Sequence, residues 1–222
     1  MGKDDRNWIP ETIDLDWIEA ASAPVHPALL AIERAAEPDD IPILDRSSGR
    51  VLAALAAGRR RIVEVGTAYG YSTLWMALAQ PAGGRIVTID PDAGRTDQAR
   101  GWWREAGIPD DRIEVVTAPA LEALAAAEPR LAGPFDLAFI DALKPEYLAY
   151  FQAIVPRLAP AALVVADNVL WSGRVSGERP VRPDDAGTAA LKAFNETLLR
   201  DPRLSAAILP VGDGLLVATV RP

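Results

Sequence analysis

Two apolar runs in the sequence end abruptly at side chains that carry oxygen. Residues 137–144 read Leu-Ala-Phe-Ile-Asp-Ala-Leu-Lys, and residues 163–168 read Leu-Val-Val-Ala-Asp-Asn. If both runs are neighbouring strands of a parallel sheet, their carboxyl ends place Asp141, Asp167 and Asn168 on one rim, where open α/β sheets bind ligands. Three such oxygen donors suit a hard divalent cation, Mg²⁺ or in its place Mn²⁺ or Ca²⁺. Lys144, one turn after Asp141, would then lie near the metal as a candidate base.

A second pattern predicts a cofactor site. Residues 63–73 read Val-Glu-Val-Gly-Thr-Ala-Tyr-Gly-Tyr-Ser-Thr, which is typical of a strand that turns into a helix. Glycines occupy the turn, where a ligand close to the backbone leaves no room for a Cβ atom. A dinucleotide site needs another glycine two residues after Gly66, and Ala68 stands there instead. The loop therefore favours a cofactor that carries an amino acid, with Glu64, Gly66 and Ser72 as candidate contacts.

Helices and strands alternate through the middle of the chain, which predicts a parallel sheet with helices on both faces. The expected strands are Arg61 to Val65, Arg85 to Asp90, Ile113 to Thr117, Phe135 to Asp141 and Ala162 to Ala166. The expected helices are Ala28 to Ala36, Gly49 to Ala57, Ser72 to Ala79, Arg95 to Ala106, Leu121 to Ala127 and Pro145 to Arg157. Asp90 ends the second strand, where its carboxylate can accept both hydroxyls of a ribose.

The end of the chain departs from this alternation. A polar loop from Ser172 to Gly187 precedes a helix from Thr188 to Leu199. Two short apolar strands, Ala206 to Val211 and Leu215 to Val220, flank a Gly-Asp-Gly turn and predict an antiparallel hairpin. The prediction is thus an α/β, Rossmann-like fold with a mainly parallel seven-stranded sheet and a C-terminal hairpin, an arrangement that resembles class I methyltransferases.

Composition narrows the function classes. The 222 residues, half of them hydrophobic, fit a single domain spanning 1–222. There is no cysteine, and the one histidine, His26, lies far from the acidic cluster, which argues against zinc sites and Ser-His-Asp triads. A net charge of −8 argues against a broad nucleic-acid surface and favours small molecules. No apolar stretch reaches the roughly 20 residues of a membrane span, and the start lacks a signal peptide's apolar centre, which predicts a cytoplasmic protein.

Four segments carry a specific resemblance. They are residues 63–73, Phe-Ile-Asp-Ala-Leu-Lys at 139–144, Val-Val-Ala-Asp-Asn-Val-Leu-Trp-Ser-Gly-Arg-Val at 164–175, and Leu-Pro-Val-Gly-Asp-Gly-Leu at 209–215. In order and spacing, from about Ile41 to the C-terminus, the chain resembles the cation-dependent O-methyltransferases, the group of the catechol and caffeoyl-CoA enzymes and their bacterial relatives. The resemblance implies that Asp141, Asp167 and Asn168 bind the metal and that Lys144 is the general base. It implies that the contacts to S-adenosylmethionine are Leu44, Glu64, Gly66, Ser72, Asp90, Ala118 and Asp141.

The chain departs from the family pattern at three places. Ala118 stands where a glycine usually precedes a small or acidic residue, Leu143 replaces an acidic or aromatic residue, and no carboxylate occurs shortly before Asp213. The acceptor is therefore less defined than the chemistry. We expect a small aromatic vicinal diol, with Trp171 and Tyr147 each fitting equally a wall for that ring or the core. Arg174, Arg179 and Arg182 in the polar loop suit a substrate carboxylate, a coenzyme A phosphate or an RNA backbone.

Several alternatives stay open on sequence grounds. The main one is methylation of a hydroxylated wobble uridine in tRNA, which some bacterial relatives perform. A nicotinamide-dependent oxidoreductase would use the same fold class, but the missing glycine and the absence of a Tyr-x-x-x-Lys pair near a strand end count against it. A non-catalytic cofactor-binding protein would have no need of Lys144 three residues after a metal ligand. We also expect a homodimer, with the N-terminal helical segment 1–48 contributing to the acceptor side and to dimer contacts.

Overall fold

The computed structural model describes residues 11–126, 128–182 and 185–221. The first ten residues of the predicted N-terminal segment 1–48 lie outside this part. Four other positions also lie outside it: 127, at the end of one predicted helix, 183 and 184, in the predicted polar loop, and 222, the last residue of the predicted domain.

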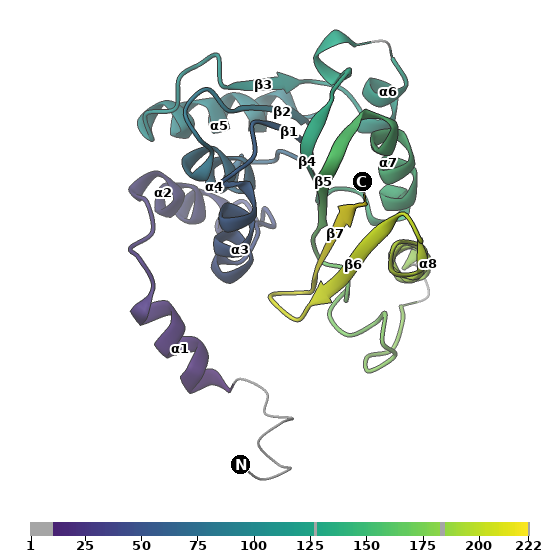
Figure 1. Cartoon of the computed structure of the whole chain (residues 1–222). Helices are drawn as coiled ribbons and strands as arrows, with labels where there is room; N and C mark the ends of the chain where they lie inside the picture. The colour runs from purple at the N-terminus through teal and green to yellow at the C-terminus, as the bar shows by residue number, and fades with distance from the viewer. Residues whose placement is uncertain (1–10, 127, 183–184, 222) are drawn as a thin grey trace.

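A seven-stranded sheet forms the centre of the molecule, in the order β3-β2-β1-β4-β5-β7-β6 (Figure 1). Strands β1 to β5 pair in parallel, and β7 runs antiparallel to both β5 and β6. The strands are β1 (Arg61–Val65), β2 (Arg85–Ile89), β3 (Ile113–Val116), β4 (Phe135–Ile140), β5 (Leu158–Ala166), β6 (Leu204–Leu209) and β7 (Leu215–Val220). The predicted Rossmann-like sheet with a C-terminal hairpin is confirmed.

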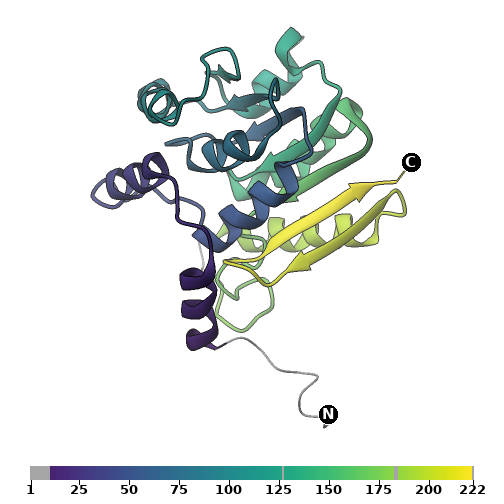
Figure 2. The ribbon, with the colours of Figure 1, turned by 60° about the vertical axis from the view of Figure 1, so that its left-hand side comes forward.

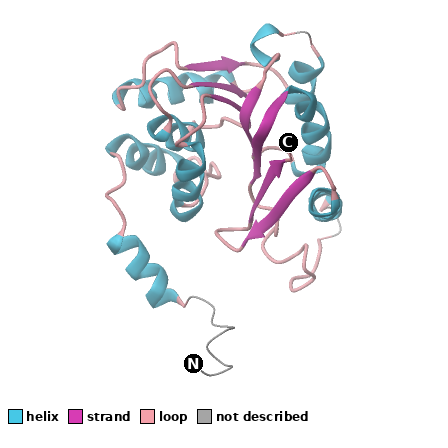
Figure 3. Cartoon of the chain, viewed as in Figure 1, coloured by secondary structure: helices cyan, strands magenta, loops and turns pink. Residues whose placement is uncertain are grey.

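Helices cover both faces of the sheet (Figures 1 and 3). One face carries α2 (Pro27–Ala36), α3 (Arg46–Ala56), α4 (Tyr71–Ala79) and α5 (Ala93–Glu105), and the other carries α6 (Ala120–Ala125), α7 (Tyr147–Ile154) and α8 (Ala186–Arg200). Successive residues of a strand point to opposite faces. Accordingly, Ile62 packs in the core under α2 to α5, and its neighbour Val63 packs in the core under α6 to α8. Both faces of β1 are buried, which explains its continuous apolar run.

Some boundaries differ from the sequence-based expectation because local chemistry overrides the apolar pattern. The predicted helix from Pro145 to Arg157 is split into a 3-10 turn (Lys144–Glu146), α7, and a second 3-10 turn (Val155–Arg157). Each 3-10 turn contains a proline, which lacks the N–H that a continuing helix would use. Helix α3 begins at Arg46, three residues before the expected Gly49. Its N-cap is Asp45, whose side chain accepts hydrogen bonds from the backbone N–H groups of Ser47 and Ser48.

Two strand boundaries also move. Strand β5 begins at Leu158, four residues before the predicted start, and a register shift against β4 accommodates the extra residues. The first hairpin strand is β6, Leu204–Leu209, displaced by two residues from the prediction. Neither shift moves the residues at the carboxyl ends of β4 and β5.

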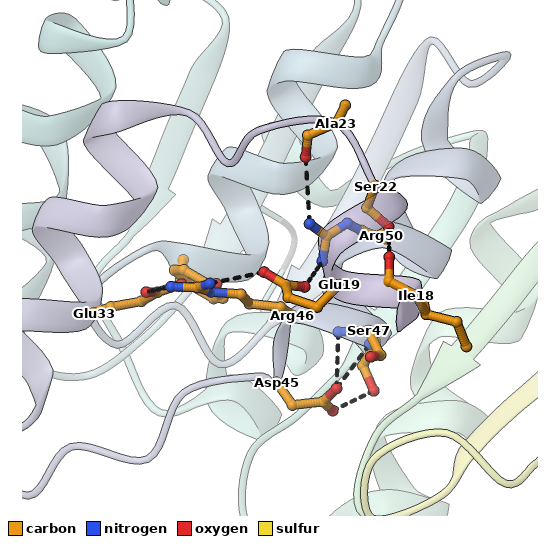
Figure 4. A network of polar contacts seen from close by, with 11 residues as sticks. Ile18, Glu19, Ser22, Ala23, Glu33, Asp45, Arg46, Ser47 and Arg50 are labelled. Carbon is orange, nitrogen blue, oxygen red and sulfur yellow. Dashed lines mark hydrogen bonds and ion pairs between the residues drawn. The ribbon is translucent and has the colours of Figure 1, made fainter. Parts of the chain in front are cut away.

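The first described helix, α1 (Thr12–Ala21), contains no buried residue and projects from the rest of the molecule (Figures 1 and 2). Ion pairs attach it to α3, which is itself paired with α2 (Figure 4). Arg46 lies between Glu19, at 2.8 Å, and Glu33, at 2.6 Å, and Arg50 pairs with the other oxygen of Glu19 at 2.6 Å. Large apolar side chains of α1 remain exposed: Ile13, Leu15, Trp17 and Ile18.

None of the helices in the described ranges is both long and apolar enough to cross a membrane.

Candidate active site

A cavity of about 1040 Å³ lies at the carboxyl ends of the five parallel strands. Each of these strands contributes its following loop to the wall, which is the usual ligand position in open α/β sheets. The wall residues that follow β1 and β2 include Gly66, Ser72 in the first turn of α4, and Asp90, and the N-terminal side contributes Leu44. The loops after β4 and β5 contribute Asp141, Lys144, Asp167, Asn168 and Trp171. Residues that are far apart in the sequence are thus brought to one cavity.

The glycine loop after β1 is shaped by the protein's own backbone. Gly66 has a φ of +97°, and a Cβ atom there would lie 1.9 Å from the carbonyl oxygen of Asp141. Gly70, with a φ of +70°, would place a Cβ atom 2.5 Å from the ring of Trp103. Both glycines are therefore required by contacts within the fold, whereas the sequence suggested that a ligand excludes the Cβ atom. The close approach at Gly66 joins the ends of β1 and β4.

Asp90 lies in the part of the cavity wall that follows β2. Its Oδ2 accepts hydrogen bonds from the backbone N–H groups of Thr67, at 3.1 Å, and Ala68, at 2.8 Å. Its Oδ1 accepts one from the N–H of Asp92 at 2.9 Å. The carboxylate is thereby fixed in orientation, and Oδ1, which accepts a single hydrogen bond, retains a lone pair for a further donor.

Glu64 and Ala118 lie behind the cavity wall. Glu64 is fully buried and accepts hydrogen bonds from the hydroxyls of Ser72, at 2.6 Å, and Thr73, at 2.5 Å. Burial raises the pKa of Glu64 to about 7, although the two hydroxyl donors pull it down. Glu64 therefore orients Ser72, and Ser72 lines the cavity. Ala118 is not in the cavity wall, but the two residues that follow it, Pro119 and Ala120, are.

The acidic rim surrounds Lys144. The Lys144 Nζ donates hydrogen bonds to Asp141 Oδ1 and Asn168 Oδ1, both at 2.7 Å, and to the hydroxyl of Tyr147 at 2.6 Å. Asn168 has a φ of +56°, a left-handed conformation that asparagine tolerates better than most residues. The structure thus brings together Asp141, Lys144 and Asn168 as the sequence predicted.

Asp167 lies beside this cluster and has a buried carboxylate oxygen, Oδ1, without a hydrogen-bond partner among the described residues. Burial first, and then the neighbouring charge of Asp141, raise the pKa of Asp167 to about 7. An unpartnered buried carboxylate oxygen is costly unless a cation or donor compensates it.

Tyr147 belongs to the core. Its side chain is fully buried and packs edge-on against Phe194, at 5.5 Å between ring centroids. Burial, followed by the charges of Asp141 and Asp167, holds the pKa of its hydroxyl well above the usual value, so the group stays neutral. Tyr147 therefore does not form a wall for an acceptor ring. It positions Lys144, a role that no sequence pattern indicated.

Trp171 follows the acidic rim and is fixed by Asp185 at the start of α8. The indole Nε1 donates to both carboxylate oxygens of Asp185, at 3.0 and 3.1 Å. Asp185 also caps α8 by accepting from the N–H groups of Gly187 and Thr188. The sequence predicts the start of this helix at Thr188, two residues after its observed start, and so leaves Asp185 in the polar loop. The contact of Asp185 with Trp171 depends on a return of the chain that the sequence does not reveal.

Comparisons with known proteins agree with this geometry. The O-methyltransferase family model matches residues 40–220. The chain is 36% identical to a catechol O-methyltransferase of Mycobacterium tuberculosis, with 100% of both proteins covered. Among solved structures, it resembles an O-methyltransferase from Bacillus cereus in complex with S-adenosylhomocysteine, with a TM-score of 0.81, 30% identity, and 93% and 96% of the two chains covered. It also resembles the O-methyltransferase TomG from Streptomyces achromogenes in complex with S-adenosylmethionine, with a TM-score of 0.81, 30% identity and 100% of both chains covered.

The chain therefore belongs to the O-methyltransferase family, and the predicted class, an S-adenosylmethionine-dependent O-methyltransferase, is confirmed. The nicotinamide-dependent and non-catalytic alternatives are wrong. The alternative acceptor, a hydroxylated uridine of tRNA, gains no support from these relatives.

Proposed function

We propose that this enzyme transfers the methyl group of S-adenosylmethionine to one hydroxyl of a small aromatic vicinal diol, with a divalent cation held by Asp141, Asp167 and Asn168. The observation that carries the proposal is the convergence of two carboxylates, an amide oxygen and the Lys144 amine at the wall of one cavity. Mg²⁺ is the expected metal, and Mn²⁺ or Ca²⁺ would suit the same oxygen ligands.

The residues present fit such a cation. All three ligands are oxygens, and the unpartnered buried Oδ1 of Asp167 is the kind of atom that a cation satisfies. In the described part of the chain, no three side chains of His, Cys, Asp or Glu gather as a metal site. The proposed set differs because its third ligand is the amide oxygen of Asn168. When bound, the cation would stabilise the negative charge that develops on a hydroxyl as its proton leaves.

Lys144 is proposed as the base that takes this proton. A phenol has a pKa of about 10 and is mostly protonated near neutral pH, so it needs a proton acceptor. As a neutral amine, Lys144 has a lone pair on Nζ for that proton. The Nζ atom that would take the proton lies within hydrogen-bond distance of Asp141, Asn168 and Tyr147, which fix its position at the wall of the cavity.

The other half of the cavity is proposed to hold S-adenosylmethionine. Asp90 would accept a hydrogen bond from a ribose hydroxyl, because Oδ1 of its fixed carboxylate has a spare lone pair. The loop backbone at Gly66 and the Ser72 hydroxyl would bind the amino-acid end, with Glu64 acting through Ser72. The remaining contacts are proposed from residues in or directly behind the wall: Leu44, Ala118 and Asp141.

The acceptor is proposed to be a diol because two adjacent oxygens can bind one cation together. Such chelation displaces two waters and fixes one oxygen toward the methyl group, which a single phenol cannot do. Trp171, in the same wall, offers an aromatic face to the acceptor ring.

Transfer of labelled methyl groups tests the proposal. 3,4-dihydroxycinnamate and 3,4-dihydroxybenzoate should be labelled, whereas their mono-hydroxy analogues and bulk tRNA should not. Excess chelator should abolish labelling, and Mg²⁺ should restore it.

Lys144→Met should lower the rate by about 10² to 10⁴, the usual contribution of a general base. Lys192→Met removes the same charge at an exposed position of α8 and should behave as the unmodified enzyme. Full activity in chelator would refute the metal, and labelling of tRNA alone would refute the diol.

We also propose that residues 1–222 act as one methyltransferase domain and that the enzyme is a homodimer. Residues of segment 1–48, such as Leu44, already contribute to the cavity wall. A ten-residue helix is marginal without tertiary packing, and α1 leaves Trp17 70% exposed. A second copy packed on the apolar side of α1 would supply that packing. Trp17→Glu should then convert a dimer to a monomer in light scattering, and a Trp17→Glu protein that remains dimeric would exclude this surface.

A further inference from the structure

Arg174 places a guanidinium group in the wall of the cavity, on the segment between β5 and α8. Its side chain is only 18% exposed. A guanidinium is rarely held this far from water unless it has an anionic partner, because burial of an unpaired charge is costly. Arg174 therefore needs an anionic partner, either in the protein or in a bound molecule.

The nearest carboxylate does not use up the donors of Arg174. Arg174 Nε forms an ion pair with Asp185 Oδ2 at 3.9 Å, but this distance is beyond hydrogen-bond range. Asp185 is already engaged by the Trp171 indole and the first turn of α8, and the Thr188 hydroxyl is the main cause that lowers its pKa. Arg174 makes one long hydrogen bond, from Nη1 to the carbonyl oxygen of Trp171 at 3.3 Å. Within the described ranges, the other guanidinium N–H groups have no hydrogen-bond acceptor.

The position of Arg174 relative to the rim limits the size of that anion. The Arg174 Cζ lies 5.6 Å and the Lys144 Nζ 5.9 Å from the ring centroid of Trp171. The two cations are therefore within about 12 Å of each other. At standard bond lengths, a dihydroxycinnamate separates its hydroxyls from its carboxylate by roughly 9 Å, which lies within this limit. A carboxylate on a short, rigid arm therefore fits the separation of the two cations, whereas the phosphates of a coenzyme A thioester lie at the end of a long chain of rotatable bonds.

We infer that Arg174 binds a carboxylate carried by the acceptor on a short arm opposite its two hydroxyls. The inference rests on the proposed function, and it makes the acceptor an acidic diol of the dihydroxybenzoate or dihydroxycinnamate type. With a net charge of −8, the chain as a whole repels such anions, so a cation inside the cavity is needed to bind one. Arg182, also in the cavity wall, adds a second positive charge at this end.

Paired substrates test the inference. The unmodified enzyme should show a KM for 3,4-dihydroxycinnamate about 10- to 100-fold lower than for its methyl ester, as expected for a charge-assisted hydrogen bond. Arg174→Gln should raise the KM of the acid by the same factor, change kcat by about twofold or less, and leave the ester unaffected. Arg174→Lys should recover part of the affinity. In calorimetry with the enzyme loaded with S-adenosylhomocysteine, the affinity for the acid should be highest for the unmodified enzyme, intermediate for Arg174→Lys and lowest for Arg174→Gln.

Arg179→Gln is the matched control, because Arg179 lies on the same segment but outside the cavity wall. It should leave all these values unchanged. Equal KM values for acid and ester, an equal effect of both arginine variants, or a preference for the coenzyme A thioester that survives in Arg174→Gln would overturn the inference while the diol activity stands. Absence of turnover with every diol would overturn the proposed function and the inference with it.

Discussion

Lys144→Met should destabilise the metal-free enzyme and leave the Mg²⁺-bound enzyme nearly unaffected. In the structure the Lys144 ammonium lies between Asp141 and Asn168, two of the proposed metal ligands, at 2.7 Å from each. It is the positive charge that offsets Asp141 and the neighbouring Asp167. Methionine keeps the length and much of the volume of the side chain but removes that charge.

The magnitude follows from burial. The Lys144 side chain is 11% exposed and that of Asp141 is 27% exposed, so the pair is neither fully buried nor at the surface. Breaking a buried pair costs about 3–5 kcal/mol, and an exposed pair is worth about 0–1 kcal/mol. We expect a loss of about 2 kcal/mol in chelator, which corresponds to a decrease of about 4–8 °C in Tm for a chain of this size.

Mg²⁺ should remove this difference in stability between Lys144→Met and the unmodified enzyme. A ligand at 100 times its Kd stabilises a protein by about 2.7 kcal/mol. Without the ammonium competing for Asp141 and Asn168, the variant should bind the cation more tightly and gain more than the unmodified enzyme. Thermal unfolding of Lys144→Met, of the control Lys192→Met and of the unmodified enzyme, each in chelator and in Mg²⁺, measures both effects. If Mg²⁺ stabilises all three proteins equally, or Lys144→Met shows no loss in chelator, the lysine does not share its partners with a metal.

Three further outcomes are expected. Gly66→Ala should lower the free energy of unfolding by about 4 kcal/mol or more, because its Cβ would lie 1.9 Å from a backbone oxygen; Gly58→Ala, in open space, should be nearly neutral in the same denaturant titration. Asp90→Asn should weaken calorimetric binding of S-adenosylhomocysteine about 10-fold or more, and unchanged affinity would remove Asp90 from the cofactor site. Burial raises the pKa of Glu64 from 4.5 to about 7, so its contribution to stability is present below pH 4.5 and lost as the pH rises through 7. Glu64→Gln should therefore gain stability relative to the unmodified protein between pH 5 and pH 8, and a constant difference in Tm would contradict the raised pKa.

The sequence predicts the sheet well because its strands are short apolar runs bounded by turn residues. It also predicts the acidic rim, since an abrupt change from apolar to oxygen-bearing side chains marks the carboxyl end of a strand. Asp141, Asp167 and Asn168 were placed from this change alone, and Lys144 from its spacing. These features are local in the chain, so the sequence carries them directly.

Features that depend on contacts between distant segments were not predicted. Gly66 was correctly expected in a tight turn, but the atom that excludes its Cβ belongs to Asp141, 75 positions later. Tyr147 fitted a core or an acceptor wall equally, and only its packed position shows that its hydroxyl holds Lys144. The exposure of the apolar residues of α1 in a single chain was not predicted either, because it depends on which surfaces the rest of the fold leaves for that helix.

The C-terminal hairpin holds the loop after β5 in place, although the two segments are about 40 residues apart in the sequence. The loop after β5 carries Asn168 and Trp171, and both adopt the left-handed backbone conformation, which costs about 1–3 kcal/mol per residue unless the surroundings enforce it. The turn between β6 and β7 enforces it. The N–H groups of Val169 and Leu170 donate to the carbonyl oxygens of Gly214 and Asp213, at 3.1 and 2.9 Å.

This turn is itself tightly specified. Gly214 has a φ of +86°, and a Cβ atom there would lie 2.5 Å from the side chain of Leu170, so the turn and the β5 loop can approach only because the residue is glycine. On the α8 side, Asn195 donates from Nδ2 to the carbonyl oxygen of Val169 at 2.8 Å. The loop that carries Asn168 and Trp171 is thus clamped between the hairpin and α8. The antiparallel strands added to the parallel sheet therefore hold a proposed metal ligand and the aromatic wall in a strained but fixed geometry.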